Sequence, residues 1–216
     1  MKNRKNDKNI LMDIPAILCI AVAIICIAIV FTLNFRPLYY AEVNAKNLSD
    51  VSGFSEREIK ENYRELIRWN SFTARGPLEL PTIQISDDAM QHFDETKHIF
   101  AIIQITGIIT VLLGIVFLFL RGRSRWRMLM AGGVTALATT TLIGAVYFIA
   151  GWEKFFVTFH QILFDNELWL FDIQTDPVIL ILPESFFMKC MYLIIGIILF
   201  LSLLTIITGI RLKKKS

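Results

Sequence analysis

Four long, uninterrupted apolar stretches alternate with polar segments along the chain. They cover residues 14–35, 99–120, 128–150 and 190–210, and none contains Asp, Glu, Lys, Arg or His. Because about 20 apolar residues of helix cross the hydrocarbon core of a bilayer, each stretch predicts a transmembrane helix. The first stretch is too long for the apolar region of a signal peptide, and no clear cleavage site follows it. We therefore expect it to be retained as a span.

The polar segment at 36–98 predicts a small extramembrane cap that contains a helix at 55–68. Ser55 and Glu58 have the spacing of a capping box at the start of this helix. Its apolar positions fall on one helical face, as expected for an amphipathic helix packed on a core: Ile59, Tyr63, Leu66 and Ile67.

The remainder of the cap is predicted to contain a strand and a second helix. The alternation within 78–83 suggests a short strand, which Pro81 would confine to an edge. Ser86 is expected to cap a helix that runs on into the second span, because no helix breaker occurs before Gly107. The fold class predicted is an all-α polytopic membrane protein with four transmembrane helices and a small α+β extracytoplasmic cap.

The second polar segment, 151–189, begins with an aromatic amphipathic stretch at 152–163. Trp152, Phe155 and Phe159 share one broad helical face, the pattern of a helix lying in the membrane interface. Aromatic residues gather at membrane interfaces generally, so an anchoring belt is the simpler explanation of these residues.

Charge then predicts the orientation of the spans. In the chain as a whole, 55% of residues are hydrophobic and 19% are charged. The segments 1–13, 121–127 and 211–216 are basic, whereas residues 36–97 carry a net charge of −3 and residues 152–189 a net charge of −4. Positive residues are retained on the cytoplasmic side, so both termini and the loop at 121–127 are expected to be cytoplasmic. The basic residues would then lie at the inner leaflet, and no nucleic-acid partner is expected.

The chain has three histidines, His92, His98 and His160, and all fall in or beside the outer segments. Imidazole exchanges protons near neutral pH, so two of them can supply a base and an acid to one reaction. A zinc site made with Asp94 or Glu95 is the rival interpretation. His92 and His98 are six residues apart, which on a helix places them on roughly opposite faces. No metal site and no other cofactor are therefore expected.

Other chemical classes find little support in the sequence. No G-x-S-x-G nucleophile motif is present, and Cys190 is the one cysteine near the outer face. The absence of ionisable residues from the four stretches argues against a transporter or proton pump.

Two segments resemble the bacterial lipoprotein intramolecular transacylases. One is LPTIQISDDAMQHFDETK at 80–97, and the other is FHQILFDNELWLFDIQTDPVILILPESFF at 159–187. The plan of four spans is also similar to that family. The second segment is the more specific, because its ordered pattern is long.

The resemblance implies an acyltransferase that acts on a lipoprotein whose N-terminal cysteine carries an S-linked diacylglyceryl group. The sn-2 acyl chain would move to the α-amino group of the same cysteine, giving the lyso-form. The family's two acid-base histidines correspond to His92 and His160, and His98 lies outside both motifs. His160 is taken as the base and His92 as the acid, although the two roles could be reversed.

Further site residues are expected from the same segments. Asp94 and Asp176 are candidates for orienting the imidazoles, although acids are also common in turns and at helix N-termini. Three other residues are candidates for positioning the substrate: Lys97, Trp169 and Glu184.

The expected partners are diacylglyceryl-modified lipoproteins and membrane lipid, and the expected location is the bacterial cell membrane with the site on the outer face. The competing interpretation is a non-enzymatic membrane sensor or assembly factor whose outer domain binds a partner.

Overall fold

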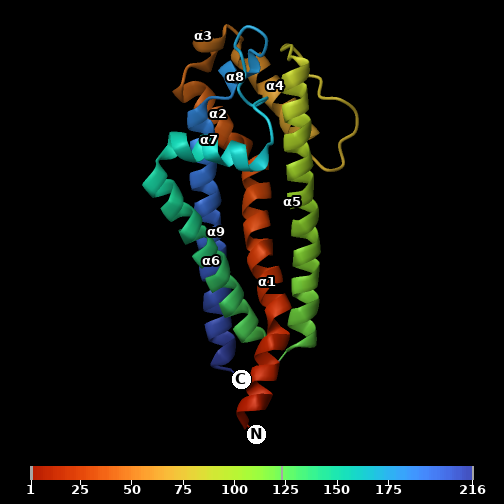
Figure 1. The fold of residues 1–216 in the computed structure, drawn as a ribbon, viewed down its shortest axis with the longest axis vertical. Coiled ribbons are helices and arrows are strands. Elements are labelled where there is room, and N and C mark those ends of the chain that lie inside the picture. Colours follow the sequence, from red (N-terminus) through yellow and green to blue (C-terminus); the bar gives the residue numbers. More distant parts are fainter. Residues whose placement is uncertain (1, 123, 216) are drawn as a thin grey trace. The chain divides into compact units, whose positions relative to one another are not determined.

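The structure is a computed structural model that describes residues 2–122 and 124–215, with side chains from residue 12 onward. Nine α-helices make up the regular structure of the described residues. Four helices contain stretches long and apolar enough to cross a membrane (Figure 1): α1 (Lys2–Asn34), α5 (Asp87–Leu120), α6 (Arg125–Ala150) and α9 (Glu184–Lys213). The other five are shorter: α2 (Arg36–Ala45), α3 (Leu48–Ser52), α4 (Glu56–Trp69), α7 (Trp152–Leu163) and α8 (Val178–Ile181).

The helix starts follow from local sequence. Ser55 Oγ accepts a hydrogen bond from the Glu58 backbone N–H, and the Glu58 carboxylate accepts one from the Ser55 N–H, so the predicted capping box is present. Ser86 Oγ accepts from the Ala89 N–H at 3.1 Å and so caps α5. The predicted continuation of this helix is also correct, since α5 runs unbroken to Leu120.

The strand predicted at 78–83 is wrong, and the cap is therefore not α+β: the described residues contain helices and irregular segments. The reason lies in the partners of this segment. The Thr82 N–H donates to Asn62 Oδ1 at 3.2 Å, and Asn62 Nδ2 donates to Thr82 Oγ1 at 2.6 Å. A side chain of α4 thus takes the place of a neighbouring strand, and Pro81 has no N–H with which to join a ladder.

The chain divides into two compact units. Unit 1 comprises Met1–Ile29, Gln104–Val146 and Leu193–Ser216. Its helices approach closely because small residues line their contacts: a Cβ added to Gly132 would lie 2.7 Å from Ile20 Cβ, and one added to Gly133 would lie 2.8 Å from the Ser202 carbonyl oxygen. Close packing through small residues is typical of helices within membranes.

Unit 2 comprises Val30–Ile103 and Tyr147–Tyr192 and contains the cap. Its core is aromatic: Tyr39 of α2 stacks on Tyr63 of α4 with ring centroids 3.6 Å apart. The Tyr39 hydroxyl donates to the Ile181 carbonyl oxygen at 2.7 Å, which ties the segment around α8 to this core. The buried carboxylate of Glu42 pairs with Lys189 and so joins α2 to the start of α9.

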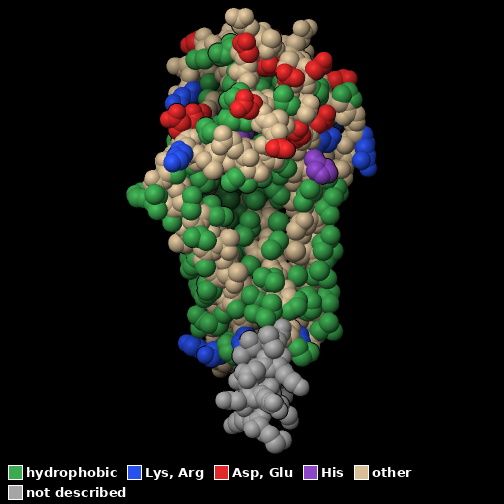
Figure 2. Space-filling model, in the orientation of Figure 1, with side chains coloured by type: hydrophobic (Ala, Val, Ile, Leu, Met, Phe, Trp, Pro, Cys, Tyr) green, Lys and Arg blue, Asp and Glu red, His purple; other side chains and the backbone are tan. Residues whose placement is uncertain are grey.

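The surface of the spans differs from that of unit 2. On the face drawn in Figure 2, hydrophobic side chains cover the apolar helices, and acidic side chains gather over the segments of unit 2. Exposed apolar side chains on a long helix are expected where lipid is the solvent. Examples on α5 are Ile108, Ile109, Leu112 and Val116.

Candidate active site

His92 lies in the second turn of α5, in the polar part of the helix that precedes the apolar stretch beginning at Ile99. The side chain is buried, with 8% of its surface exposed. The ring edges of Phe164 and Phe171 contact the imidazole, with centroid distances of 4.7 and 5.5 Å. Within the described residues, the buried Nδ1 of His92 has no hydrogen-bond partner. This histidine is therefore enclosed by aromatic rings and has unused hydrogen-bonding capacity.

His160 lies in the last turn of α7, and its Nδ1 is 2.8 Å from the carbonyl oxygen of Phe156. A carbonyl oxygen can only accept, so Nδ1 carries the proton of this hydrogen bond. In the neutral ring, Nε2 is then left with a free lone pair. The rings of Phe156 and Trp169 pack on this imidazole at centroid distances of 4.2 and 4.6 Å. His160 is thus held in a fixed tautomer that suits a proton acceptor.

The two imidazoles lie close to each other. Their ring centroids are 6.2 Å apart with an angle of 31° between the planes. Phe164 contacts both rings, at 4.7 Å from His92 and 5.8 Å from His160. At this spacing one reacting group can lie within hydrogen-bonding reach of both histidines.

Burial lowers the pKa of both histidines. The pKa of His92 falls from 6.5 to about 4, because desolvation and repulsion from His160 disfavour the charged ring and outweigh the opposing effect of Glu95. Desolvation also lowers the pKa of His160, against the opposing effect of its hydrogen bond to Phe156. Both imidazoles are therefore neutral at pH 7, the state in which one can accept a proton.

Asp176 was expected to orient an imidazole, but its carboxylate has other partners. It accepts hydrogen bonds from the Ser86 N–H at 2.7 Å, from Ser86 Oγ at 3.0 Å and from Thr175 Oγ1 at 2.7 Å. Ser86 is the residue that caps α5, so Asp176 fixes the start of the helix that carries His92.

The other predicted residues lie in different settings. Trp169 packs directly on His160. The Lys97 ammonium lies 4.1 Å from the centroid of the Trp69 ring, a cation–π contact. Asp94 is exposed on α5, and Glu184 is exposed as the first residue of α9. The third histidine, His98, is also exposed.

Three residues near the histidines were missed from the sequence, and a fourth, Glu95, was considered there only as a possible zinc ligand. Phe164 and Phe171 form the aromatic wall around His92. Asn166 Nδ2 donates to both carboxylate oxygens of Glu95 at 3.1 Å, a contact between residues 71 positions apart. The one available signal was the position of Glu95, three residues after His92 and hence on the same side of a helix.

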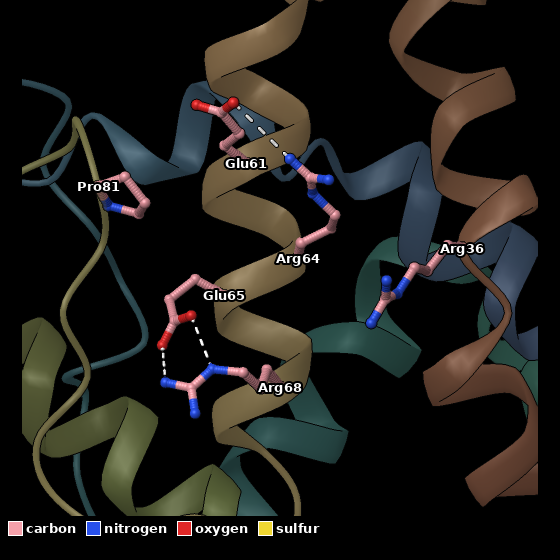
Figure 3. A pocket seen from close by; sticks show the side chains of 6 residues that line it. All are labelled: Arg36, Glu61, Arg64, Glu65, Arg68 and Pro81. Carbon is pink, nitrogen blue, oxygen red and sulfur yellow. Dashed lines mark hydrogen bonds and ion pairs between the residues drawn. The ribbon is translucent and has the colours of Figure 1, made fainter.

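A cavity of about 430 Å³ on α4 is a separate feature of unit 2. Figure 3 shows that the charged side chains contributed by α4 pair along the helix, Glu61 with Arg64 and Glu65 with Arg68. Neither histidine lines it, so it is not the candidate active site. In the described part of the chain, no group of three or more His, Cys, Asp or Glu side chains is placed to hold a metal ion.

The fold and the site together define a multi-pass membrane protein with a pair of neutral histidines, one buried and one half-buried, suited to acid-base chemistry. Comparison with known proteins then identifies the family. The family model of the lipoprotein intramolecular transacylase Lit matches residues 14–187. The chain belongs to this family and is an acyltransferase of lipoproteins. No protein with a curated description matches it.

Solved structures agree with the family. A structure of the membrane-integral transacylase Lit from Bacillus cereus is 31% identical, with a TM-score of 0.89 over 97% of this chain and 98% of that chain. A histidine-to-arginine variant of the same protein is 30% identical, with a TM-score of 0.86 over 99% of this chain and 95% of that chain. A histidine-to-alanine variant is 30% identical, with a TM-score of 0.86 over 99% and 97%. The chain is therefore a multi-pass bacterial membrane protein.

Proposed function

We propose that this protein moves the sn-2 acyl chain of an S-diacylglyceryl lipoprotein to the α-amino group of the same N-terminal cysteine. The new bond joins the amine nitrogen to the acyl carbonyl carbon, and the bond from that carbon to the glyceryl oxygen breaks. The nitrogen, which starts as an ammonium group at neutral pH, loses two protons; one reaches the glyceryl oxygen and the other is released to solvent. The product is an N-acyl, S-monoacylglyceryl lipoprotein, the lyso-form. The observation that carries the proposal is the pair of neutral imidazoles, with ring centroids 6.2 Å apart among aromatic side chains, in a member of this family.

His160 is assigned as the base. An α-amino group has a pKa of about 8 and is mostly ammonium at neutral pH, so a proton must leave before the nitrogen can attack. The hydrogen bond from His160 Nδ1 to the Phe156 carbonyl oxygen leaves Nε2 free to accept that proton. The lowered pKa keeps the ring neutral and available at pH 7.

His92 is assigned as the acid partner. Because burial keeps its ring neutral, it acts by donating an N–H hydrogen bond to the glyceryl oxygen as that oxygen becomes negative. His92 then gives this N–H proton to the departing oxygen, and the proton that His160 accepted restores the neutral ring of His92. Amine and ester belong to one substrate molecule, so proximity supplies much of the rate and no covalent enzyme intermediate is required.

The aromatic wall is assigned to the lipid part of the substrate. Phe164 and Phe171 beside His92, and Trp169 beside His160, offer apolar surface on which an acyl chain can lie next to the reacting ester. We assign Asp176 a positioning role, since it fixes the N-terminus of α5 through Ser86.

The proposed orientation places both termini in the cytoplasm and the histidine site on the outer face. The basic residues at 121–127 and 211–216 and the negative outer segments support this arrangement. A diacylglyceryl lipoprotein holds its acyl chains in the outer leaflet and its cysteine at the surface. Its sn-2 ester would then lie at the depth of the histidine pair.

Substitution of single histidines tests the assignment. His92→Ala and His160→Ala should each lower lyso-form production by at least about 100-fold, the usual lower contribution of acid-base catalysis. Mass spectrometry of the N-terminal peptide of a lipoprotein measures the product. His98→Ala is the matched control and should keep nearly full activity, because this imidazole is exposed and outside the pair. Full activity in a folded His160→Ala variant would overturn the mechanism.

A further inference from the structure

We propose that the carboxylate of Glu95 binds the α-ammonium group of the substrate's N-terminal cysteine beside the histidine pair. This inference rests on the proposed function and adds to it a recognition site for the nucleophile.

Glu95 is held in place next to His92. The two residues are three positions apart on α5 and therefore share one side of the helix. Both carboxylate oxygens of Glu95 accept from Asn166 Nδ2 at 3.1 Å, and Oε1 also accepts from Gln91 Nε2 at 3.1 Å. The side chain is half-buried. A carboxylate offers about four acceptor sites, so it can still accept from a substrate N–H.

Asn166 connects this carboxylate to the wall of the other histidine. Its Oδ1 accepts from the Leu168 N–H at 3.1 Å, which fixes the turn that leads into Trp169. The Trp169 ring packs on His160 at a centroid distance of 4.6 Å. Glu95 therefore lies where the segment carrying His92 meets the segment that follows His160.

The site needs a negative charge to receive an ammonium ion. Both imidazoles are neutral at pH 7, and moving a cation from water into an aromatic pocket is costly unless a counter-charge is present. Two groups act electrostatically on His92, namely the nearby His160 and Glu95 on its own helix.

The neighbouring charged side chains are less suited to this role. Asp94 on α5 is exposed, and Lys97 on the same helix lies over the Trp69 ring. In the loop after α7, Asp165 and Glu167 flank Asn166 and are exposed. Glu95 is the half-buried acid among these neighbours. Its carboxylate would hold the ammonium until His160 takes a proton, which leaves the nitrogen lone pair close to the ester.

The first test is kinetic. Glu95→Gln keeps the shape and an acceptor oxygen but removes the charge, so we expect kcat/KM for a diacylglyceryl lipopeptide to fall about tenfold to hundredfold at pH 7, the range for a hydrogen bond to a charged group. The deficit should shrink toward pH 9.5, because the substrate amine, with a pKa of about 8, loses its charge. Glu167→Gln makes the same change at an exposed acid beside Asn166 and should stay close to wild type.

Two results would overturn the proposal. A deficit that is the same at every pH would indicate a purely structural role for Glu95. An equal loss in Glu167→Gln would indicate general attraction by an acidic surface.

The second test uses the wild-type enzyme and two inhibitors with an sn-2 ether in place of the ester, one with the α-amino group and one without it. The amine-bearing compound should inhibit about tenfold more strongly at pH 7. Equal inhibition would contradict the ammonium site even if Glu95→Gln fails to fold. If the proposed function itself were wrong, wild-type enzyme would form no N-acyl product from the ester substrate. That result is distinguishable from the absence of an ammonium site at Glu95.

Discussion

Removal of the Asp176 carboxylate should loosen the start of α5. Its oxygens accept from the Ser86 N–H, from Ser86 Oγ and from Thr175 Oγ1, and 4% of the residue is exposed. The hydroxyls can rotate toward other acceptors, whereas the part-buried backbone N–H of Ser86 cannot. In Asp176→Ala, that lost charged hydrogen bond costs about 1.5–3 kcal/mol. Loss of a negative charge near a helix N-terminus adds about 0.3–1 kcal/mol.

The expected loss in the free energy of unfolding is therefore about 2–4 kcal/mol for Asp176→Ala, the sum of these two contributions. Asp176→Asn should lose less, because the amide oxygen can still accept from the Ser86 N–H. Unfolding of the purified protein in mixed micelles, followed by circular dichroism, measures the change. Asp165→Asn, an exposed aspartate in the same outer segment, is the control. A loss below about 0.5 kcal/mol in Asp176→Ala, within the range of ordinary surface substitutions, would refute the capping role.

The remaining predictions concern protonation and a buried ion pair. In histidine-labelled protein, NMR titration should give a midpoint near 4 for His92 and one below 6.5 for His160. Stability should accordingly fall as the pH drops from 6.5 toward 4, because the unfolded chain binds these protons more readily. Midpoints at or above 6.5 would be inconsistent with burial of the pair. Asp13→Ala should lower the free energy of unfolding by about 3–5 kcal/mol, since it leaves Arg121 and Arg127 without the buried carboxylate that each contacts at 2.9 Å.

Local sequence predicted the four spans and the helix at 55–68 because their causes are local, but it did not predict α2, α3 or α8. A run of apolar residues and the capping box at Ser55 each favour a helix through interactions within one short segment of the chain. The prediction of a strand at 78–83 was wrong because strand formation depends on a partner that is distant in the sequence. Its alternation was real, but a strand requires a neighbouring strand, and Asn62, 20 positions away, satisfied Thr82 instead. Nothing in the local pattern reports such a partner.

In the candidate site, too, residues within a recognisable sequence motif were predicted, whereas contacts between distant residues were not. The motif resemblance supplied His92 and His160, and the structure brings them within 6.2 Å. Asp176 was selected as an acid near the site, but its partner Ser86 is 90 positions away, so its capping role was invisible in the sequence. The contact between Glu95 and Asn166 was likewise hidden, because neither lies in a periodic pattern and they are 71 positions apart.

The central claim is that this chain moves an acyl chain from the sn-2 oxygen to the cysteine nitrogen within one lipoprotein. The most direct measurement uses a diacylglyceryl lipopeptide with an isotope-labelled sn-2 chain, incubated with purified wild-type protein and with His160→Ala and analysed by tandem mass spectrometry. The account predicts that the wild-type protein places the label on the α-nitrogen of the same peptide and leaves the sn-1 ester intact, and that His160→Ala does not. Label released as free fatty acid, or found on the nitrogen of an unlabelled peptide mixed into the reaction, would contradict it.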